Sequence, residues 1–373
     1  MLRVILLVLV STAALASDHT DESVASIFAN VTMASGYRYG LKDSAGMQMS
    51  CLHVDAIRGS TVIWGGDKYF GLYHTMVGKQ FNVRLASSTD LLTWTFRRTI
   101  VENGDMPFLK RVDGDDKDGW IMLTHEQWMS PNSQLPSQLG FKLFYNESEL
   151  LAGKHFNSFT APLSVGAYSK LEGTPSIYGV NRTMEGGLYM VNADIGFHFN
   201  EKSGIDTVAI GRLEKFGPTT VQPSLTGQHR ADAYDELFIA KGAIGNIGQR
   251  APGIIQGIHI NAQEANIGKM PPTIWADWRI WLYFFGPNEG DVPTGAGGSR
   301  VEMLKVTTHK GSTAIGNPSW HLLPCPGMQE LVGVGGDCIF VSYFVFGEGA
   351  APGEAGVLAF WKTLSTADSH VHH

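Results

Sequence analysis

The chain has 373 residues, of which 43% are hydrophobic and 17% charged, and its formal net charge is -7. This length and composition fit a globular protein with one large core or two domains. Because the chain is acidic and has no basic tract, nucleic acid and anionic membrane surfaces are not expected as partners. The 44 glycines and 10% aromatic residues favour many strands joined by tight turns.

The N-terminus has the pattern of a secretory signal peptide over residues 1–16. Arg3 supplies the basic region, residues 4–10 the apolar region, and Ala14-Leu15-Ala16 a cleavage site of small residues. A membrane anchor is the alternative reading, but the apolar run is short for a span and no later stretch is long and apolar enough. We therefore expect a secreted, extracellular chain that begins at Ser17.

Glycosylation sequons and cysteines agree with export. The sequons, if the host uses them, would make the chain a glycoprotein, and they begin at Asn30, Asn146 and Asn181. Of the 3 cysteines, Cys325 and Cys338 would close a short loop rich in proline and glycine. A disulfide from Cys51 to either of these two stays open from the sequence.

Strand-like segments recur along the chain in groups of about four. The first group is 61–64, 68–75, 81–87 and 94–100, and the second is 106–112, 120–127, 141–145 and 156–161. The third is 174–180, 187–192, 207–212 and a region after Pro218, followed by a short helix within 229–241. The fourth is 250–260, 279–285, 300–307 and 320–323, and the fifth is 331–334, 338–346 and 357–363.

Five such groups at intervals of roughly 50 to 70 residues predict an all-β fold, a five-bladed β-propeller in a single domain of residues 17–365. The fifth group lacks an outer strand, and the strand-like segment 26–33 could supply it and close the ring from the N-terminus. Residues 366–373 are expected to form a disordered tail. A β-sandwich is the alternative architecture.

Three acidic residues stand just ahead of strands that would be the innermost of their blades. They are Asp55, Asp105 and Glu172. Innermost strands line the central channel of a propeller, so residues at their starts should converge on one mouth of that channel. Carboxyl groups in a shared pocket repel, which pushes their pKa values apart. One protonated and one ionised acid is the arrangement that cleaves glycosidic bonds.

At these residues the chain resembles the five-bladed glycoside hydrolases of family 43 and its relatives, families 32, 62, 68 and 117. The segment Glu172-Gly173-Thr174-Pro175 is similar to the Glu-Gly-Pro motif that carries the general acid there, with Thr174 inserted. The segment 88–94, Ser-Thr-Asp-Leu-Leu-Thr-Trp, is similar to the turn that ends first blades in that family. The segment Gly104-Asp105-Met106-Pro107 resembles the aspartate motif of the second blade.

The resemblance implies an inverting glycosidase, similar to arabinofuranosidases and xylosidases, that acts on a polysaccharide or oligosaccharide. Glu172 would be the general acid, Asp55 the base that activates water, and Asp105 the residue that keeps the acid protonated and holds the sugar. The family usually has Asp-Pro where this chain has Asp55-Ala56, so His53 is an alternative for the residue that faces the channel there. Each acid also has a structural reading, as a turn or surface residue.

Substrate contacts are expected from four further side chains: His53, Trp128, Asp194 and Arg250. Arg250 opens the fourth group, where a guanidinium could bind sugar hydroxyls or a carboxylate, or form a structural salt bridge. Trp128 could stack on a sugar ring, although packing between blades is the commoner role of such an aromatic. His198 could border the pocket. No cofactor or catalytic metal is expected, while His259 keeps open a structural ion such as calcium near the axis.

The expected partner is a carbohydrate, and the chain is expected to act as a monomer. Two other functions stay open: a propeller that binds a glycan without cleaving it, and a scaffold that interacts with a host. A sialidase would need an arginine triad and a repeated Ser-x-Asp-x-Gly-x-Thr-Trp turn, of which the chain has one near-match.

Overall fold

The computed structural model describes residues 23–58, 66–113, 119–130, 133–200, 206–218, 222–245, 247–268, 275–327 and 337–364. The expected signal peptide, the expected strands 61–64 and 331–334, and the expected tail 366–373 lie outside these residues. Within the described part of the chain, no helix is long and apolar enough to cross a membrane.

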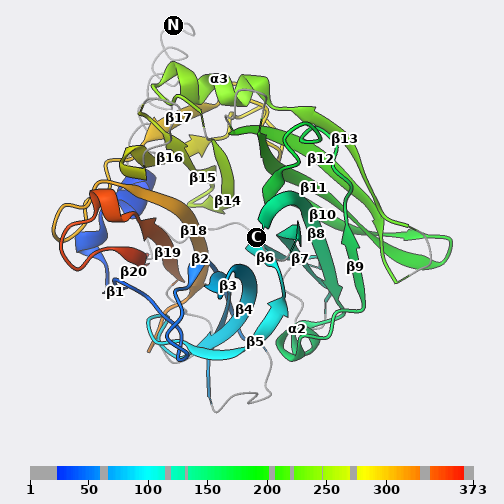
Figure 1. Cartoon of the computed structure of the whole chain (residues 1–373), viewed down its shortest axis with the longest axis horizontal. Helices are drawn as coiled ribbons and strands as arrows, with labels where there is room; N and C mark the ends of the chain where they lie inside the picture. Colours follow the sequence, from blue (N-terminus) through cyan, green and yellow to red (C-terminus); the bar gives the residue numbers. More distant parts are fainter. Residues whose placement is uncertain are drawn as a thin grey trace, which may run out of the picture.

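The structure is a five-bladed β-propeller (Figure 1), which confirms the predicted fold. Blade 1 consists of β2 (Ser50–Ala56), β3 (Tyr69–Val77), β4 (Gln80–Ser88) and β5 (Thr95–Val101), and blade 2 of β6 (Gly104–Arg111), β7 (Ile121–Ser130), β8 (Ser133–Phe144) and β9 (Asn157–Thr160). Blade 3 consists of β10 (Glu172–Glu185), β11 (Leu188–Asn200), β12 (Asp206–Phe216) and β13 (Ser224–Arg230). Blade 4 consists of β14 (Gly248–Ile255), β15 (Ile258–Asn266), β16 (Trp278–Phe284) and β17 (Arg300–Met303). Blade 5 consists of β18 (Ile315–Pro324), β19 (Asp337–Val345), β20 (Gly356–Thr363) and β1 (Gly36–Arg38).

The ring closes from the N-terminus as predicted, but through β1 and not through residues 26–33. β1 pairs antiparallel with β20, with Gly36 opposite Trp361. Glycine fits there because a Cβ would lie 2.5 Å from the Trp361 indole nitrogen. Residues 23–29 are helical, since Val24, Phe28 and Val31 follow the spacing of a helix and are buried against blades 4 and 5. The prediction of a strand over 26–33 was therefore wrong.

The boundary between the last two blades also differs from the prediction. The segment 250–260 is a hairpin of β14 and β15, because the chain turns at Gln256-Gly257 with φ values of 52° and 75°. Residues 320–323 belong to β18, which is the innermost strand of blade 5 and not the outer strand of blade 4. Isoleucines on both sides of Gln256-Gly257 make the two strands read as one, although this dipeptide forms a two-residue turn.

Two short elements confirm the sequence reading. The helix expected within 229–241 is α3 (Asp232–Ala240). In the turn after β4, Asp90 Oδ1 accepts hydrogen bonds from the Leu92 and Thr93 N–H groups at 2.9 and 2.6 Å. Trp94 is buried and packs between blades 1 and 5. This turn supports the fold and has no part in the site described below.

Apolar side chains form five core clusters, one between each pair of neighbouring blades. The predicted disulfide is confirmed: Cys325, just after β18, is bonded to Cys338 in β19. Cys51 takes no part in it. Blade 5 is thus held by a covalent bond at one end and by β1 at its outer edge.

The five innermost strands share one irregularity near their N-terminal ends. In each blade the register with the second strand shifts just after one residue pair, and we call these the bulge pairs: Ser50–His74, Asp105–Glu126, Gly173–His198, Gly248–Glu264 and Gly316–Phe344. The next residue adopts a left-handed φ between 47° and 50° in four blades, at Cys51, Met106, Thr174 and Asn317. Such β-bulges re-aim side chains, and here they build the mouth of the channel.

Candidate active site

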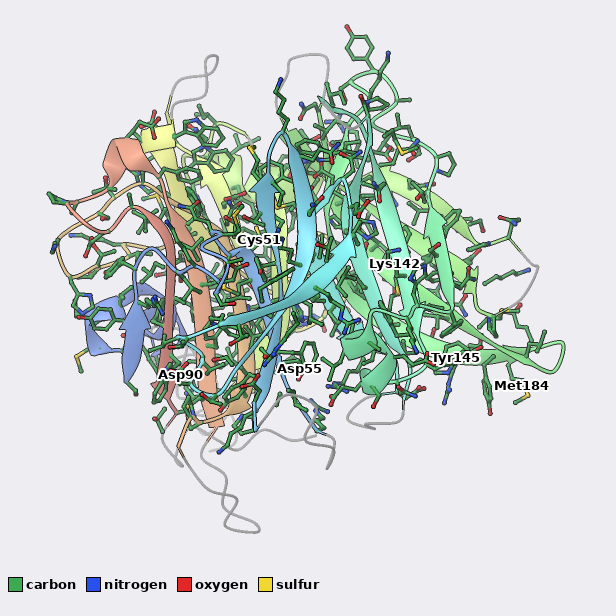
Figure 2. All side chains as sticks on the ribbon, turned by 60° about the horizontal axis from the view of Figure 1, so that its bottom comes forward. Cys51, Asp55, Asp90, Lys142, Tyr145 and Met184 are labelled. Carbon is green, nitrogen blue, oxygen red and sulfur yellow. A yellow bond between two sulfur atoms is a disulfide. The ribbon has the colours of Figure 1, made fainter. Side chains whose placement is uncertain are left out.

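The structure does not bring the three predicted acids together. Asp105 belongs to a bulge pair and lines a cavity of about 760 Å³ where the innermost strands begin, which we call the mouth cavity. Asp55 lies near the far end of β2, because that strand already begins at Ser50. It lines a separate cavity of about 460 Å³, which we call the opposite cavity. Figure 2 shows Asp55 well below Cys51 along β2.

Glu172 begins β10 but is one residue out of step with Asp105. The bulge-pair residue of blade 3 is Gly173, and side chains alternate along a strand, so Glu172 points to the other face. Its side chain is fully buried, and its Oε1 accepts hydrogen bonds from Ser164 N–H, Ser164 Oγ and Gly166 N–H at 2.7, 2.9 and 2.8 Å. Glu172 therefore fixes the loop that precedes β10 and is not among the residues that line the mouth cavity.

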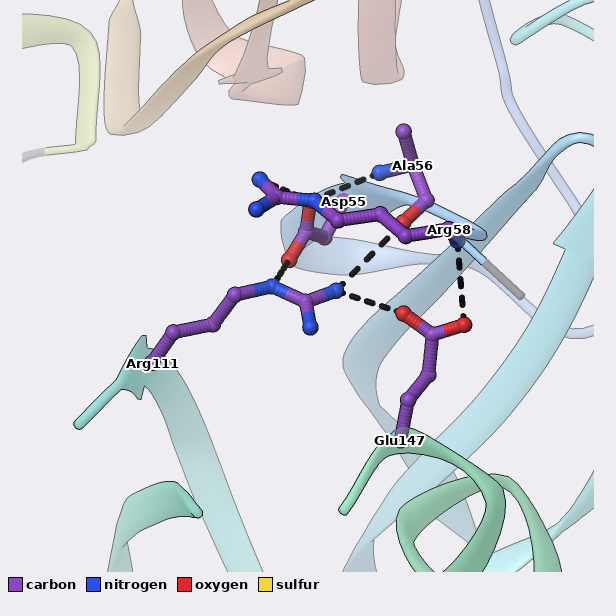
Figure 3. Close-up of polar contacts among 5 residues, drawn as sticks. All are labelled: Asp55, Ala56, Arg58, Arg111 and Glu147. Atoms are coloured by element: carbon purple, nitrogen blue, oxygen red, sulfur yellow. Dashed lines mark hydrogen bonds and ion pairs between the residues drawn. The ribbon is translucent and has the colours of Figure 1, made fainter. Parts of the chain in front are cut away.

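Asp55 belongs to an ion-pair cluster between blades 1 and 2 (Figure 3). Its Oδ2 accepts a hydrogen bond from Arg111 Nε at 2.8 Å, and Arg58 lies 3.6 Å from its Oδ1. Arg111 also pairs with Glu147 at 2.6 Å, so one guanidinium joins two carboxylates. Burial raises the pKa of Asp55, and the charges of Arg111 and Arg58 oppose that rise. This geometry fits an ion pair that links blades 1 and 2 better than it fits Asp55 as a base that activates water.

His53 faces the opposite cavity as well. Its ring centroid lies 4.0 Å from that of His321 and 5.0 Å from that of Phe108. Burial lowers the pKa of His53 to about 3, so its ring is neutral at physiological pH. His53 thus lies at the end of the channel opposite to Asp105.

Of the remaining predicted substrate contacts, two lie outside the mouth cavity and the third lies outside the described side chains. Trp128 is 6% exposed and packs edge-on against Phe81, with 5.2 Å between ring centroids. Asp194 lies in β11 and pairs with Arg212 at 3.1 Å. Neither Trp128 nor Asp194 is among the residues that line the mouth cavity. The backbone of Arg250 is in β14, and its side chain lies outside the described residues.

The mouth cavity is lined by side chains from all five blades. Its ionisable side chains are Lys42, His74, Asp105, His198 and Glu264. Its uncharged polar side chains are Gln48, Ser50, Thr75, Asn200 and Asn317. Its aromatic side chains are Phe81, Trp275, Trp278, Phe344 and Phe346. Asp105 and His198 were candidates from the sequence, whereas His74 and Glu264 were missed.

The residues after the bulge pairs form the floor of this cavity. A void of only about 20 Å³ comes next, and the left-handed residues Cys51, Met106 and Thr174 line it together with Pro107, Pro175 and Pro318. That volume holds about one water molecule. A ligand much larger than a water molecule therefore finds no room beyond these residues.

Hydrogen bonds between blades hold the bulges in place. The Met106 N–H donates to His74 Nδ1 at 3.1 Å, and the Thr174 N–H donates to Glu126 Oε2 at 3.2 Å. The Asn317 N–H donates to Glu264 Oε2 in the same way. In each case the second strand of one blade accepts from the left-handed residue of the next blade. Because His74 accepts at Nδ1, its ring proton is on Nε2.

These contacts require glycine at two positions, because a Cβ there would collide with the accepting glutamate. A Cβ on Gly173 would lie 2.1 Å from Glu126 Oε2, and a Cβ on Gly316 would lie 2.5 Å from Glu264 Oε2. A blade that presents glutamate thus requires glycine in the next blade. The sequence signal of this arrangement is Asp-x-Pro at 105–107 and Gly-x-Pro-Ser at 173–176 and 316–319.

A metal site finds no support among the residues that the structure describes. No group of three or more His, Cys, Asp or Glu side chains in that part of the chain could hold an ion. His259, the histidine considered for calcium, stacks on Phe285 with 3.7 Å between ring centroids and an interplanar angle of 3°.

No protein-family model and no curated protein sequence matches the chain. Among solved structures, it is similar to the catalytic domain of a GH62 α-L-arabinofuranosidase from Coprinopsis cinerea, at 9% identity over 91% of this chain and 98% of that one, with a TM-score of 0.45. It is also similar to a GH43_1 enzyme from Xanthomonas citri (8% identity, 91% and 93% covered, TM-score 0.42) and to MPT-4, a mannose phosphorylase from Leishmania mexicana (10%, 93% and 93%, 0.45). Families 62 and 43 are among those that the sequence resembles. At these identities the likeness shows the fold alone.

Proposed function

We propose that the chain is a secreted glycoside hydrolase that cleaves a polysaccharide or oligosaccharide in the mouth cavity. The observation that supports this most is a pair of carboxyl side chains, Asp105 from blade 2 and Glu264 from blade 4, on one blind cavity. They are 2% and 3% exposed. Carboxyl groups held out of bulk water beside amides, histidines and aromatic rings are the usual equipment for binding a sugar and cleaving its glycosidic bond.

The two carboxyl groups are assigned different roles. Glu264 is fixed by the Asn317 N–H, so its carboxylate can orient a water molecule and take a proton from it. Asp105 would donate a proton to the leaving oxygen as the bond from that oxygen to the anomeric carbon breaks. The water oxygen then bonds to the anomeric carbon from the opposite side, and the configuration inverts. This replaces the predicted pair of Glu172 and Asp55 with a pair on the bulges.

The substrate class within this function rests on the resemblance of the sequence to arabinofuranosidases and xylosidases. We propose a pentose-containing plant, algal or microbial glycan first, and action by a monomer, in which the five blades together line the mouth cavity. The blind floor favours binding of a chain end over threading of a polymer through the channel.

The test is release of reducing sugar from arabinan, xylan, fructan, galactan and aryl glycosides by the wild type and by two isosteric variants. Asp105→Asn and Glu264→Gln are each expected to lower kcat by about 10²- to 10⁴-fold, the usual contribution of a general acid or base. Glu264→Gln keeps an oxygen that can accept the Asn317 N–H, so the fold should survive. Asp105→Asn should retain more activity on aryl glycosides with good leaving groups than on glycans.

Two controls separate this assignment from the alternatives. Asp194→Asn alters an acid that pairs with Arg212 outside the cavity and should leave kcat unchanged. Glu172→Gln should also leave kcat unchanged in the folded fraction. If Glu172→Gln abolishes activity while both cavity variants remain active, the mouth cavity is not the active site and the original assignment of the acid is restored.

A carbohydrate-binding propeller without hydrolysis is the second candidate. It is favoured by one observation, that His74 and Glu264 both have a structural task as acceptors for the next blade. These residues are therefore explained without catalysis. No release of sugar from the panel, together with binding of a glycan that Glu264→Gln does not weaken, would establish this function.

A further inference from the structure

Three aromatic rings form a shelf at the rim of the mouth cavity. Trp275 lies in the short 3-10 helix η2 (Trp275–Asp277), Trp278 begins β16, and Phe346 follows β19; we call these three rings the aromatic shelf. Trp275 is nearly parallel to both others, at 20° to Trp278 with 6.0 Å between ring centroids and at 18° to Phe346 with 5.0 Å. It is also 48% exposed, which is unusual for so large an apolar side chain.

Trp278 and Phe346 pack against one face of the Trp275 indole, and neither of them covers the other face. If Trp275 were sandwiched, Trp278 and Phe346 would be separated by at least two perpendicular stacking distances, about 7 Å in all. Their centroids are only 6.2 Å apart, so both rings lie on the same side of Trp275. The shelf thus presents a flat indole surface, and contacts with Trp278 and Phe346 on the opposite face fix its orientation.

The aromatic shelf borders the proposed catalytic carboxylate. A Cβ on Gly316 would lie 2.5 Å from Glu264 Oε2 and 2.8 Å from the Phe346 ring, so both side chains press on the same glycine from the cavity side of blade 5. Phe346 in turn stacks against the Trp275 ring. The distance from the attacking-water position to the shelf is therefore set by two adjoining side chains with no flexible segment between them.

We propose that the aromatic shelf binds the second sugar of a chain end by stacking on its apolar face, while the terminal sugar lies beside Asp105 and Glu264. This rests on the proposed function and deepens it, since it makes the substrate a glycan of at least two sugars. A sugar ring exposes axial C–H groups on one face and hydroxyls at its rim. An open indole face next to polar side chains matches that division, whereas an apolar protein or lipid partner would need a larger contiguous apolar patch.

The test compares binding of matched mono- and disaccharides to the wild type and to three variants. The probes are xylose with xylobiose, arabinose with arabinobiose, and mannose with mannobiose, measured by saturation-transfer NMR and by the change in tryptophan fluorescence. The variants are Trp275→Ala, Trp275→Tyr, which keeps a flat ring, and Tyr145→Ala as a matched control. Tyr145 is a similar exposed ring, 39% exposed and stacked on Phe156 at 3.8 Å, but it lies on the outside of the propeller (Figure 2).

Trp275→Ala is expected to weaken disaccharide binding about tenfold and to leave monosaccharide binding within about twofold. Trp275→Tyr and Tyr145→Ala should stay within about twofold for both. The split between disaccharide and monosaccharide is a readout that a merely structural role of Trp275 would not produce.

The two proposals fail in different ways. If the wild type releases sugar from the panel but Trp275→Ala binds disaccharides as well as the wild type does, the shelf is wrong and hydrolysis stands. If Trp275→Ala loses disaccharide binding but the wild type cleaves nothing, the shelf is right and the protein is a lectin-like propeller. If no saccharide binds the wild type at all, recognition of a glycan at this mouth is wrong.

Discussion

Replacing Arg111 with methionine is expected to destabilise the propeller by about 3–5 kcal/mol, the usual cost of removing one partner from a buried ion pair. The Arg111 side chain is 7% exposed, and it joins Asp55 at 2.8 Å to Glu147 at 2.6 Å. Methionine keeps most of the apolar stem of arginine, so the loss comes from two carboxylates that lose the guanidinium between them. With an unfolding entropy of about 2.1 cal/mol/K per residue over about 350 residues, the melting temperature should fall by about 4–7 °C.

The loss should depend on pH in a defined direction. Burial raises the pKa of Asp55 in the folded chain, and Arg111 opposes that rise. A carboxyl group whose folded pKa is above its unfolded value contributes stability that is present below the unfolded pKa and is lost as pH rises through the folded pKa. In Arg111→Met the larger of the two opposing charges is gone and only that of Arg58 remains, so the pKa of Asp55 rises further and its ionisation costs more. The gap in melting temperature between wild type and variant should therefore be larger at pH 8 than at pH 4.

The assay is thermal unfolding followed by circular dichroism across this pH range, with a triple variant as the matched control. Adding Asp55→Asn and Glu147→Gln to Arg111→Met removes the buried charges together, which should recover most of the lost stability and flatten the pH dependence. A loss below about 1 kcal/mol, or a gap that is the same at pH 4 and pH 8, would refute the view that Arg111 compensates buried charge in this cluster.

Two further substitutions test how the blades are held. Gly173→Ala places a Cβ 2.1 Å from a glutamate oxygen of blade 2 and should cost about 1–3 kcal/mol, while Gly347→Ala, with nothing within 4 Å, should cost little; thermal melts of the two variants decide this. Removing the disulfide with Cys325→Ser and Cys338→Ser should cost about 3 kcal/mol, and a reducing agent should then lower the melting temperature of the wild type but not that of the double variant.

The sequence was sufficient for the architecture because each blade repeats the same physical pattern. Short apolar strands separated by turn residues appear about twenty times. In the turn at 88–94, the Asp90 side chain accepts backbone hydrogen bonds from the residues that follow it. Closure from the N-terminus could be expected because blade 5 lacked an outer strand. The segment chosen for it was wrong, because the strand-like segment 26–33 overlaps a short helix with one buried face.

The site was harder to predict because it depends on single-residue register. Glu172 and Gly173 are neighbours in sequence, but only the position of Gly173 corresponds to that of Asp105. A slip of one residue exchanges the two faces of a strand, and no periodicity argument fixes it. Asp55 was misplaced for a related reason: β2 contains Ser50, Cys51 and His53 and reads as a polar segment, so the next apolar run was taken as the innermost strand.

The two proposed catalytic carboxyl groups come from different members of their bulge pairs, and the contacts between blades explain why. A glutamate on the second strand of one blade fills the space where the bulge-pair residue of the next innermost strand would have its Cβ. Glycine therefore stands opposite each such glutamate, Gly173 opposite Glu126 and Gly316 opposite Glu264. An acid can stand at the inner position only where the preceding blade presents another side chain. Asp105 meets this condition because blade 1 presents His74, whose Nδ1 accepts the Met106 N–H. A His74→Glu variant would therefore place two carboxylates against one bulge, and it should lose both Asp105 function and stability, whereas His74→Gln, which keeps an acceptor, should lose less of each.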